Sequence, residues 1–352
     1  DSVRVMGKVS GTRSAYDRMQ KDWLQVCNQM GWSPDLTQLV QDNPSEATSR
    51  VLTWFGYERM VHGLKASSLR QKRAAVRNWH IDRKQPDPFL RLTAVADWLD
   101  CLAKVDGPAK PKIPVPVSLL KFIVGRLQPD RMQDQALKSA LCVGYWFLLR
   151  ASEYLAADSG RFDPDRSISW NDLFFRFTDK AGNAKVGTPQ EASKALAQGL
   201  EVSATLTLFS NKNRLGTCTR SVVATPGSPL CPVSALLDQH ASFKKHVGRE
   251  PRPEEAIMTK DPEGGVYRRK DISNVLKAAA QLANIPEAMV ASHSLRRGGA
   301  SAYVASGASD DDVMRHGRWT SEAYRAYVYA ALDKLKFALR KAQVAVPKFE
   351  KN

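Results

Sequence analysis

A histidine and two arginines stand at the start of a predicted helix whose sequence is SHSLRRGGASAYVASG. Ser292 is a typical N-cap residue and Gly307 a typical stop signal, so we expect the helix to lie between them. His293 then lies one turn before both Arg296 and Arg297, and spacing alone does not choose between these arginines. Because backbone N–H groups at a helix N-terminus favour an anion, this group suits a phosphodiester. A capping histidine beside surface arginines is the alternative interpretation.

A third arginine follows the longest apolar run of the chain, in the sequence VGYWFLLRASEYL. A guanidinium at that point is costly to bury unless it emerges into a site. Arg150 and Glu153 are three residues apart, so the carboxylate can hold the guanidinium in one rotamer. An ordinary ion pair at a helix end is an equally good interpretation.

Tyrosines gather near the C-terminus, in the sequence MRHGRWTSEAYRAYV. Gly317 is expected to end one helix, and a new helix begins after Trp319. Tyr324 and Tyr327 would share a face of the new helix, whereas Tyr329 points roughly the opposite way. Aromatic side chains at helical spacing are more often core residues, so this motif is weak by itself.

A proline-rich segment, VDGPAKPKIPVPV at 105–117, predicts a linker between two domains. Its four prolines remove backbone donors and favour an extended chain, so no helix should pass through it. Lys110 and Lys112 make the linker basic. We expect a helical domain at 1–104 and a second domain at 118–352.

The first domain carries apolar residues at helical spacing in 17–30, 46–61 and 92–103. Between the last two helices runs a basic stretch that only Asp82 and Asp87 oppose. The high density of basic residues and the near absence of acidic ones favour contacts with phosphates. The alternative interpretation is a helix face that is simply exposed to solvent. The candidate DNA-binding residues are Lys65, Arg70, Lys72, Arg73, Arg77, Arg83 and Lys84, together with Lys110 and Lys112 of the linker.

The second domain mixes helices with short strand-like stretches. We expect a helix at 119–127, an apolar helix ending near Leu155, strands at 173–177, 205–209 and 221–225, and helices from Pro232 onward. The polar insertion at 179–199 is expected to be a loop with one or two helical turns. One small sheet embedded in helices is an α+β arrangement.

Charge points to a polyanionic partner, because 52 Lys and Arg face 36 Asp and Glu, for a net charge of +16. Nucleic acid comes before an anionic membrane surface, since the longest apolar stretch, at 140–149, is far too short to span a bilayer. The five cysteines are scattered and have no zinc-ligand spacing, which indicates reduced structural residues in an intracellular protein. We expect no metal and no cofactor.

Taken in order, these motifs resemble the catalytic domain of the tyrosine recombinases: R-x-x-E after an apolar helix, then H-x-x-R, then G-x-W and a tyrosine eight residues on. The strings LLRASEYL, PLCPVSALL, HSLRRGGAS and GRWTSEAYRAYV are similar to the recombinases of Crypton and DIRS-type mobile elements. The resemblance covers roughly 115–346. It implies an all-α core-binding domain followed by an α+β catalytic domain with a small antiparallel sheet.

The resemblance also implies a role for each motif residue. Arg150 and Arg296 would clamp the scissile phosphate, with Glu153 in support and His293 beside them. Trp319 would donate its indole N–H. The segment TLTLFSNKNRLGTCTRSVVAT predicts a β-hairpin with Lys212 at its tip as general acid and Arg214 as the rival residue. Tyr327 would be the nucleophile, but many family members have nine residues between the tryptophan position and the tyrosine, so Tyr324 and Tyr329 stay open.

The activity implied is cutting and rejoining of double-stranded DNA through a 3′-phosphotyrosyl link and a Holliday junction, by four protomers on paired sites. The enzyme would work on DNA inside the cell, in the nucleus if the host is eukaryotic. Two alternatives remain. A type IB topoisomerase would use similar residues to relax supercoils, and a catalytically silent derivative would only bind DNA.

Overall fold

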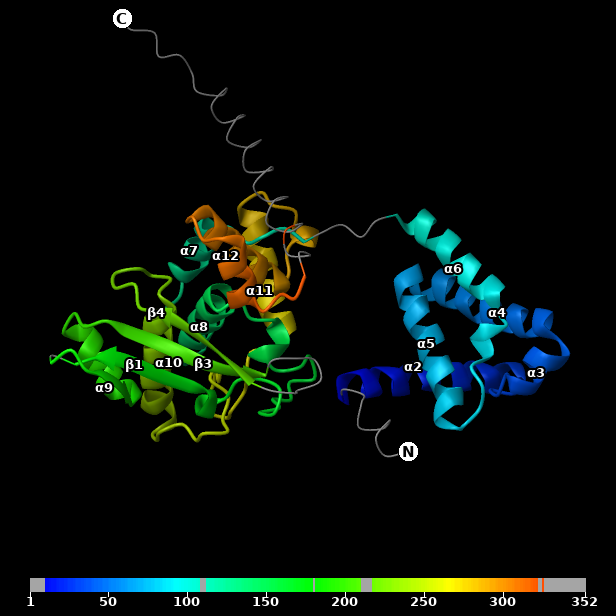
Figure 1. Cartoon of the computed structure of the whole chain (residues 1–352), viewed down its shortest axis with the longest axis horizontal. Helices are drawn as coiled ribbons and strands as arrows, with labels where there is room; N and C mark the ends of the chain where they lie inside the picture. Colours follow the sequence, from blue (N-terminus) through cyan, green and yellow to red (C-terminus); the bar gives the residue numbers. More distant parts are fainter. Residues whose placement is uncertain (1–9, 108–111, 180, 210–216, 322–324, 326–352) are drawn as a thin grey trace, which may run out of the picture. The chain divides into compact units, whose positions relative to one another are not determined.

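Each of the two units, 1–110 and 111–352, has its own main hydrophobic core. The structure is a computed structural model, and it describes residues 10–107, 112–179, 181–209, 217–321 and 325. Figure 1 draws the two units with their helices and strands. The boundary falls inside the proline-rich segment 105–117. None of the helices described is long and apolar enough to cross a membrane.

The first unit is entirely helical in its described part, as predicted. Trp23, Trp54 and Phe55 form the centre of its core, with the two indole rings 5.1 Å apart. The helix that carries Trp54 starts where the Asn43 side chain accepts a hydrogen bond from the Glu46 amide. The helices are α2 (Ser10–Met30), α3 (Thr37–Asp42), α4 (Pro44–His62), α5 (Ala66–Asp82) and α6 (Thr93–Asp106), with a 3-10 turn η1 at Pro88–Leu90.

The second unit is a helical assembly around one antiparallel sheet, which confirms the predicted α+β class. The strands are β1 (Leu173–Thr178), β2 (Ala184–Gly187), β3 (Val202–Phe209) and β4 (Thr217–Val223), in the order β2-β1-β3-β4. The helices are α7 (Val117–Val124), α8 (Met132–Trp146), α9 (Pro189–Ala197), α10 (Pro232–Val247), α11 (Arg269–Leu282), α12 (His293–Ala305) and α13 (Asp310–Gly317). Short 3-10 turns are η2 (Ala151–Glu153), η3 (Trp170–Asp172) and η4 (Glu287–Met289).

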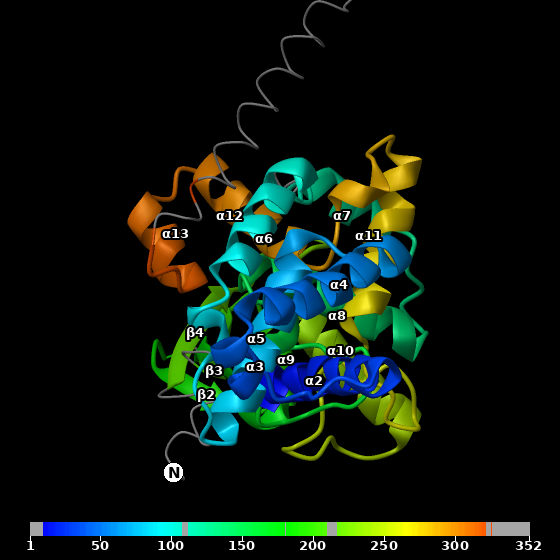
Figure 2. The same cartoon turned by 90° about the vertical axis from the view of Figure 1, so that its right-hand side faces the viewer.

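The sheet is connected to the site through a stack of helices. Helices α9 and α10 pack on the sheet, α8 packs on α10, and α12 packs on α8. Helix α13 lies beside α12, as the orange ribbons of Figure 2 show. Strand β3 is central and buries Val202, Ala204 and Leu206 completely. The β3–β4 pairing, with Phe209 opposite Thr217, confirms the predicted hairpin.

The apolar helix α8 is shorter than predicted, since it ends at Trp146 and not near Leu155. Leu148 has φ of +52°, a left-handed conformation that costs a residue with a side chain about 1–3 kcal/mol. The carbonyl of Trp146 accepts hydrogen bonds from the Tyr303 hydroxyl and the His316 ring, both at 2.9 Å. Tertiary contacts from α12 and α13 therefore end α8. The sequence around Trp146 gives no indication of these contacts.

The polar insertion at 179–199 is more ordered than the predicted loop, because it contains β2 and α9. Thr188 and Glu191 form a reciprocal capping box that starts α9 after Gly187. Strand β2 then pairs with β1 at the edge of the sheet. The missed signal was the T-x-x-E pattern at 188–191.

The second half of the predicted linker is attached to the second unit. The amide of Ile113 donates to the Met289 carbonyl at 2.8 Å, and that of Val115 donates to the Ser294 carbonyl at 3.0 Å. A Cβ on Gly298 would lie 2.2 Å from the Val115 carbonyl, so a glycine lets this segment approach α12. The segment from 112 to 116 is thus a strap along α12.

The contact between α12 and α8 generates the first prediction. A Cβ on Gly299 would lie 2.0 Å from the Tyr145 carbonyl, so Gly299→Ala must push the two helices apart and should destabilise the fold by about 1–3 kcal/mol or more. Gly56→Ala on α4 is the control: nothing lies within 4 Å, and alanine should stabilise that helix by up to about 1 kcal/mol. Chemical denaturation of the whole chain measures both, and equal stability of the two variants would contradict this packing.

Candidate active site

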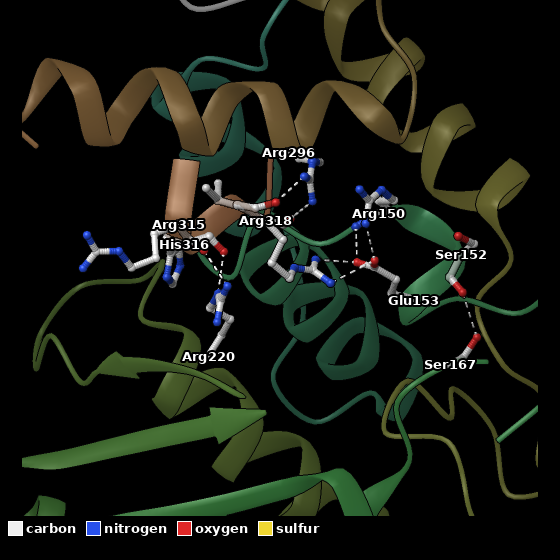
Figure 3. A network of polar contacts seen from close by, with 11 residues as sticks. Arg150, Ser152, Glu153, Ser167, Arg220, Arg296, Arg315, His316 and Arg318 are labelled. Atoms are coloured by element: carbon white, nitrogen blue, oxygen red, sulfur yellow. Dashed lines mark hydrogen bonds and ion pairs between the residues drawn. The ribbon is translucent and has the colours of Figure 1, made fainter. Parts of the chain in front are cut away.

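A single guanidinium, that of Arg296, lies at the centre of the site with only 1% of its surface exposed. One terminal nitrogen donates to the carbonyl of Leu148, just beyond α8, and the other donates to the carbonyl of Gly317, the last residue of α13. Figure 3 shows this side chain descending from α12 toward the end of α13. Arg296 therefore ties three helices together, deeper in the protein than a residue expected only to clamp a phosphate.

The surroundings of Arg296 both destabilise and stabilise its positive charge: burial and two nearby arginines destabilise it, and the carbonyls that it contacts stabilise it. Burial, together with the positive charges of Arg150 and Arg318, lowers its pKa to about 9, which still leaves it protonated at neutral pH. The carbonyls that it contacts lie at the C-terminal end of a helix or just beyond one, where the helix dipole favours a cation. Arg296 is thus a fixed positive charge with no carboxylate bonded directly to it in the described contacts.

Trp319 covers Arg296, with the guanidinium 4.2 Å from the centroid of the indole ring. A Cβ on Gly317 would lie 1.7 Å from that ring, so only glycine permits the tryptophan to fold back at this point. Arg318, between the two, adopts a left-handed conformation with φ of +59°. The short sequence G-R-W is therefore a tight reversal that places the indole face on the arginine.

Glu153 binds two arginines, one three residues away and the other 165 residues away in the sequence. Its carboxylate accepts from the Arg150 guanidinium at 2.9 Å and the Arg150 amide at 2.7 Å. Arg318 donates to both oxygens, at 3.0 and 2.7 Å. Burial opposes ionisation of Glu153, but the Arg318 hydrogen bonds and charge, followed by those of Arg150, lower its pKa overall. Figure 3 shows the carboxylate between the two guanidiniums. The contact with Arg150 was predicted from the sequence, whereas the contact with Arg318 was not.

His293 begins α12 and keeps an exposed surface. Desolvation by neighbouring protein atoms and the charges of Arg297, Arg296 and Arg150 lower its pKa to about 4. The ring is therefore neutral at pH 7. Ser292, the expected N-cap, has helical backbone angles and makes no side-chain cap, so α12 begins without one.

The β3–β4 hairpin is joined to the site through Arg220. From β4, its guanidinium donates to the carbonyls of His316 and Arg315, the last turn of α13 (Figure 3). The connection between the two strands carries Lys212 and Arg214, which lie outside the described residues. The three candidate nucleophiles, Tyr324, Tyr327 and Tyr329, also lie outside them.

The structure brings Arg150, Glu153, His293, Arg296 and Trp319 together around one centre. It adds Arg318, which sequence reasoning did not single out although the G-R-W motif contained it. Three guanidiniums face one carboxylate, so the site carries excess positive charge and suits a phosphate group. Within the described ranges, no group of His, Cys, Asp and Glu side chains is arranged to hold a metal ion.

The basic stretch of the first unit does not lie uniformly at the surface. Lys72 is a correction: it is only 7% exposed and binds Glu58 and Asp22 at 2.6 and 2.7 Å, over the Trp54 ring. Arg70 pairs with Asp100 at 2.6 Å. Lys72 is a buried structural residue because the helix face on which it lies turns inward, and it is not a DNA-contact candidate.

The other candidates keep accessible surface. Lys65, Arg70, Arg77, Arg83 and Lys84 are exposed, and Arg73 and Lys112 are half-buried. Arg77 pairs with Asp87 at 2.5 Å, and Arg83 stacks 3.9 Å from the Trp79 ring centroid. Lys112 donates to the Ala288 carbonyl of the strap contact, and Lys110 lies outside the described residues.

Comparison with known proteins finds structural similarity only. No protein-family model matches the chain, and no curated protein sequence matches it. The Tn1549 transposon integrase in complex with transposon right end DNA is 12% identical, with a TM-score of 0.41 over 92% of this chain and 98% of that one. The same integrase with circular intermediate DNA is 13% identical, with a TM-score of 0.42 over 90% and 99%. The XerA recombinase is 11% identical, with a TM-score of 0.37 over 92% and 98%.

The position of Arg296 generates the second prediction. Arg296→Ala leaves two buried carbonyls without donors, so it should lower the free energy of unfolding by about 3 kcal/mol or more. Arg297→Ala removes a neighbouring, half-buried guanidinium that donates to the Lys112 carbonyl, and should cost about 1 kcal/mol. Urea denaturation compares them. A smaller destabilisation by Arg296→Ala than by Arg297→Ala would contradict its structural role.

Proposed function

We propose that this chain is a tyrosine recombinase that cuts and rejoins double-stranded DNA, of the type found in Crypton and DIRS-type mobile elements. The observation that carries the proposal is the meeting of Arg150 and Glu153 with His293 and Arg296, from two segments far apart in the sequence. Desolvation is the largest cause of the lowered pKa of His293. The charges of Arg297, Arg296 and Arg150 lower it further, because these side chains lie close to the ring. A cluster of fixed positive charge stabilises the anionic transition state of phosphoryl transfer.

The proposed chemistry assigns the attack to Tyr327. Its phenolic oxygen bonds to the scissile phosphorus while the bond to the 5′-oxygen breaks, giving a 3′-phosphotyrosyl link and a free 5′-hydroxyl. His293, neutral at pH 7, accepts the phenolic proton, and Lys212 protonates the departing oxygen. The phenolate is itself a leaving group, so attack by a 5′-hydroxyl reverses the step and rejoins the DNA.

The arginines divide the electrostatic work. Arg150 is 45% exposed and is proposed to contact the non-bridging oxygens. Arg296 adds fixed charge from behind Trp319, whose indole N–H is the remaining proposed donor. The segment 1–104 is proposed to be the core-binding domain, 105–117 the connection and 118–352 the catalytic domain, acting as a tetramer on paired sites through a Holliday junction. In a eukaryotic host the protein would act in the nucleus.

The third prediction tests the reaction itself. A nicked duplex carrying the candidate site should trap the protein as a covalent adduct, in excess EDTA and without nucleotide triphosphate. Arg150→Ala should slow adduct formation by orders of magnitude with little change in DNA affinity, because its interaction strengthens in the transition state. Tyr327→Phe should abolish it.

Three outcomes would count against the proposal. An adduct that persists in Tyr327→Phe but disappears in Tyr324→Phe or Tyr329→Phe would move the nucleophile. A requirement for magnesium would contradict the mechanism. Relaxation of supercoiled plasmid without paired sites would identify the chain as a topoisomerase.

The fourth prediction concerns the basic residues at α5 that are proposed to bind DNA phosphates. Removing one cation that neutralises a phosphate should flatten the slope of log affinity against log salt by about 0.9. Lys65→Ala with Arg73→Ala should therefore reduce the slope by up to about 1.8. Lys72→Met is the matched control, because Lys72 is buried in ion pairs: it should change stability and leave the slope as it is. An unchanged slope in the double variant would mean that these charges only solvate the helix.

A further inference from the structure

The Arg318–Glu153 ion pair joins two segments 165 residues apart, and the expected roles of the motif residues do not account for it. The Arg318 side chain is only 6% exposed and that of Glu153 16%. The geometry is bidentate, with two parallel N–H···O bonds of 3.0 and 2.7 Å. Such a pair is geometrically specific, and breaking it leaves a charge without its partner in a low dielectric.

Arg150 depends on the same carboxylate. Its guanidinium makes its 2.9 Å side-chain contact with Glu153, while 45% of the side chain remains exposed. Glu153 Oε1 accepts from both guanidiniums, and Oε2 accepts from Arg318 and from the Arg150 amide. The direction of the exposed guanidinium is therefore set by a carboxylate that is itself oriented by Arg318 (Figure 3).

Arg318 lies at the end of α13 and reaches Glu153 from the other side of the site. It follows the last residue of α13 and precedes Trp319, in a left-handed turn that few residues other than glycine adopt readily. Its guanidinium points back across the site to Glu153, the last residue of η2, which Arg150 directly precedes. The pair thus connects the G-R-W reversal to the most exposed arginine of the site.

We propose that Arg318 is a positioning residue: it fixes Glu153 and, through Glu153, holds the Arg150 guanidinium in the orientation that receives the scissile phosphate. This rests on the proposed strand-transfer function. Two arginines share one carboxylate, so one positive charge is left for the phosphate. Precise orientation of such a group is worth a large factor in rate, because a misplacement of about 1 Å can cost about 100-fold.

The test is a double-mutant cycle on the suicide-substrate reaction of the full chain. Arg318→Ala should slow adduct formation by about 10- to 100-fold, with DNA affinity close to that of the wild type. In a Glu153→Gln background the same substitution should have little further effect, because the carboxylate that transmits it is gone. Arg315→Ala, which removes an exposed arginine of the preceding helix α13, should cleave at the wild-type rate.

Arg318→Lys keeps the charge but cannot make two parallel hydrogen bonds, so it should also be slow. It replaces Arg318→Ala in the cycle if thermal unfolding shows that the alanine variant does not fold. The proposal is overturned if the Arg318 substitution slows the reaction by the same factor in both backgrounds, or leaves the rate unchanged.

The pH profile separates positioning from a merely structural role. The charged and titratable groups near Glu153 are Arg150, Arg318, Arg296 and Tyr154. Without Arg318 the two largest contributions that lower the pKa of Glu153 are lost and its pKa rises, so the carboxylate is protonated more readily as the pH falls and releases Arg150. The rate of Arg318→Ala should fall more steeply than that of the wild type toward pH 5, and parallel profiles would overturn the proposal.

A readout that needs no catalysis keeps this inference separate from the function. NMR of the arginine Nε–H groups should find Arg150 rigid in the wild type and mobile in Arg318→Ala. If the wild type forms no adduct but Arg150 loosens in the variant, the strand-transfer function fails and the positioning link stands. If Arg150 is equally ordered in both, the positioning link fails whatever the wild type does.

Discussion

The site depends on one buried cation, the Arg296 guanidinium, which lies where the ends of three helices meet. Arg296 donates to carbonyls of Leu148 and Gly317, so the end of α8, the start of α12 and the end of α13 meet at its guanidinium. A buried arginine is costly unless its donors are satisfied and its charge is opposed by dipoles, and helix C-termini provide both. The requirement accounts for nearby features that look unrelated in sequence: the left-handed Leu148, the glycines that bring α12 against α8, and the fold-back of Trp319 over Gly317.

This arrangement combines a buried, rigidly held arginine, Arg296, with an exposed one, Arg150. Arg296 is held by backbone carbonyls and cannot reorient without disturbing three helices. Among the residues that the structure describes, the Arg150 guanidinium is held by the side chain of Glu153. Excess positive charge in a partly dry site raises the free energy of the empty protein, since Arg150 and Arg318 both lower the pKa of Arg296 after burial itself. A phosphate would relieve that repulsion, which is the physical basis of the proposed phosphoryl-transfer function.

Similar residues have different fates in the first unit. Lys72 and Lys65 belong to one basic stretch, but Lys72 is oriented toward Glu58 and Asp22 while Lys65 stays at the surface before α5. Burial of Lys72 over Trp54 closes the contact between α2, α4 and α5. The density of basic residues in a sequence is thus an upper limit on the charge that a surface offers to DNA.

Local patterns in the sequence determined the helical first unit, the β3–β4 hairpin, the α+β class, and the grouping of Arg150 with Glu153 and of His293 with Arg296 and Arg297. Each rests on residues within a few positions of one another, where periodicity and i,i+3 spacing are informative. The tertiary structure alone decided that α8 stops at Trp146, that Lys72 is buried, that Arg296 and not Arg297 binds Leu148 and Gly317, and that Arg318 reaches Glu153. These outcomes depend on partners up to 170 residues away, and a helix face or a carboxylate acquires such a partner only when the chain has packed.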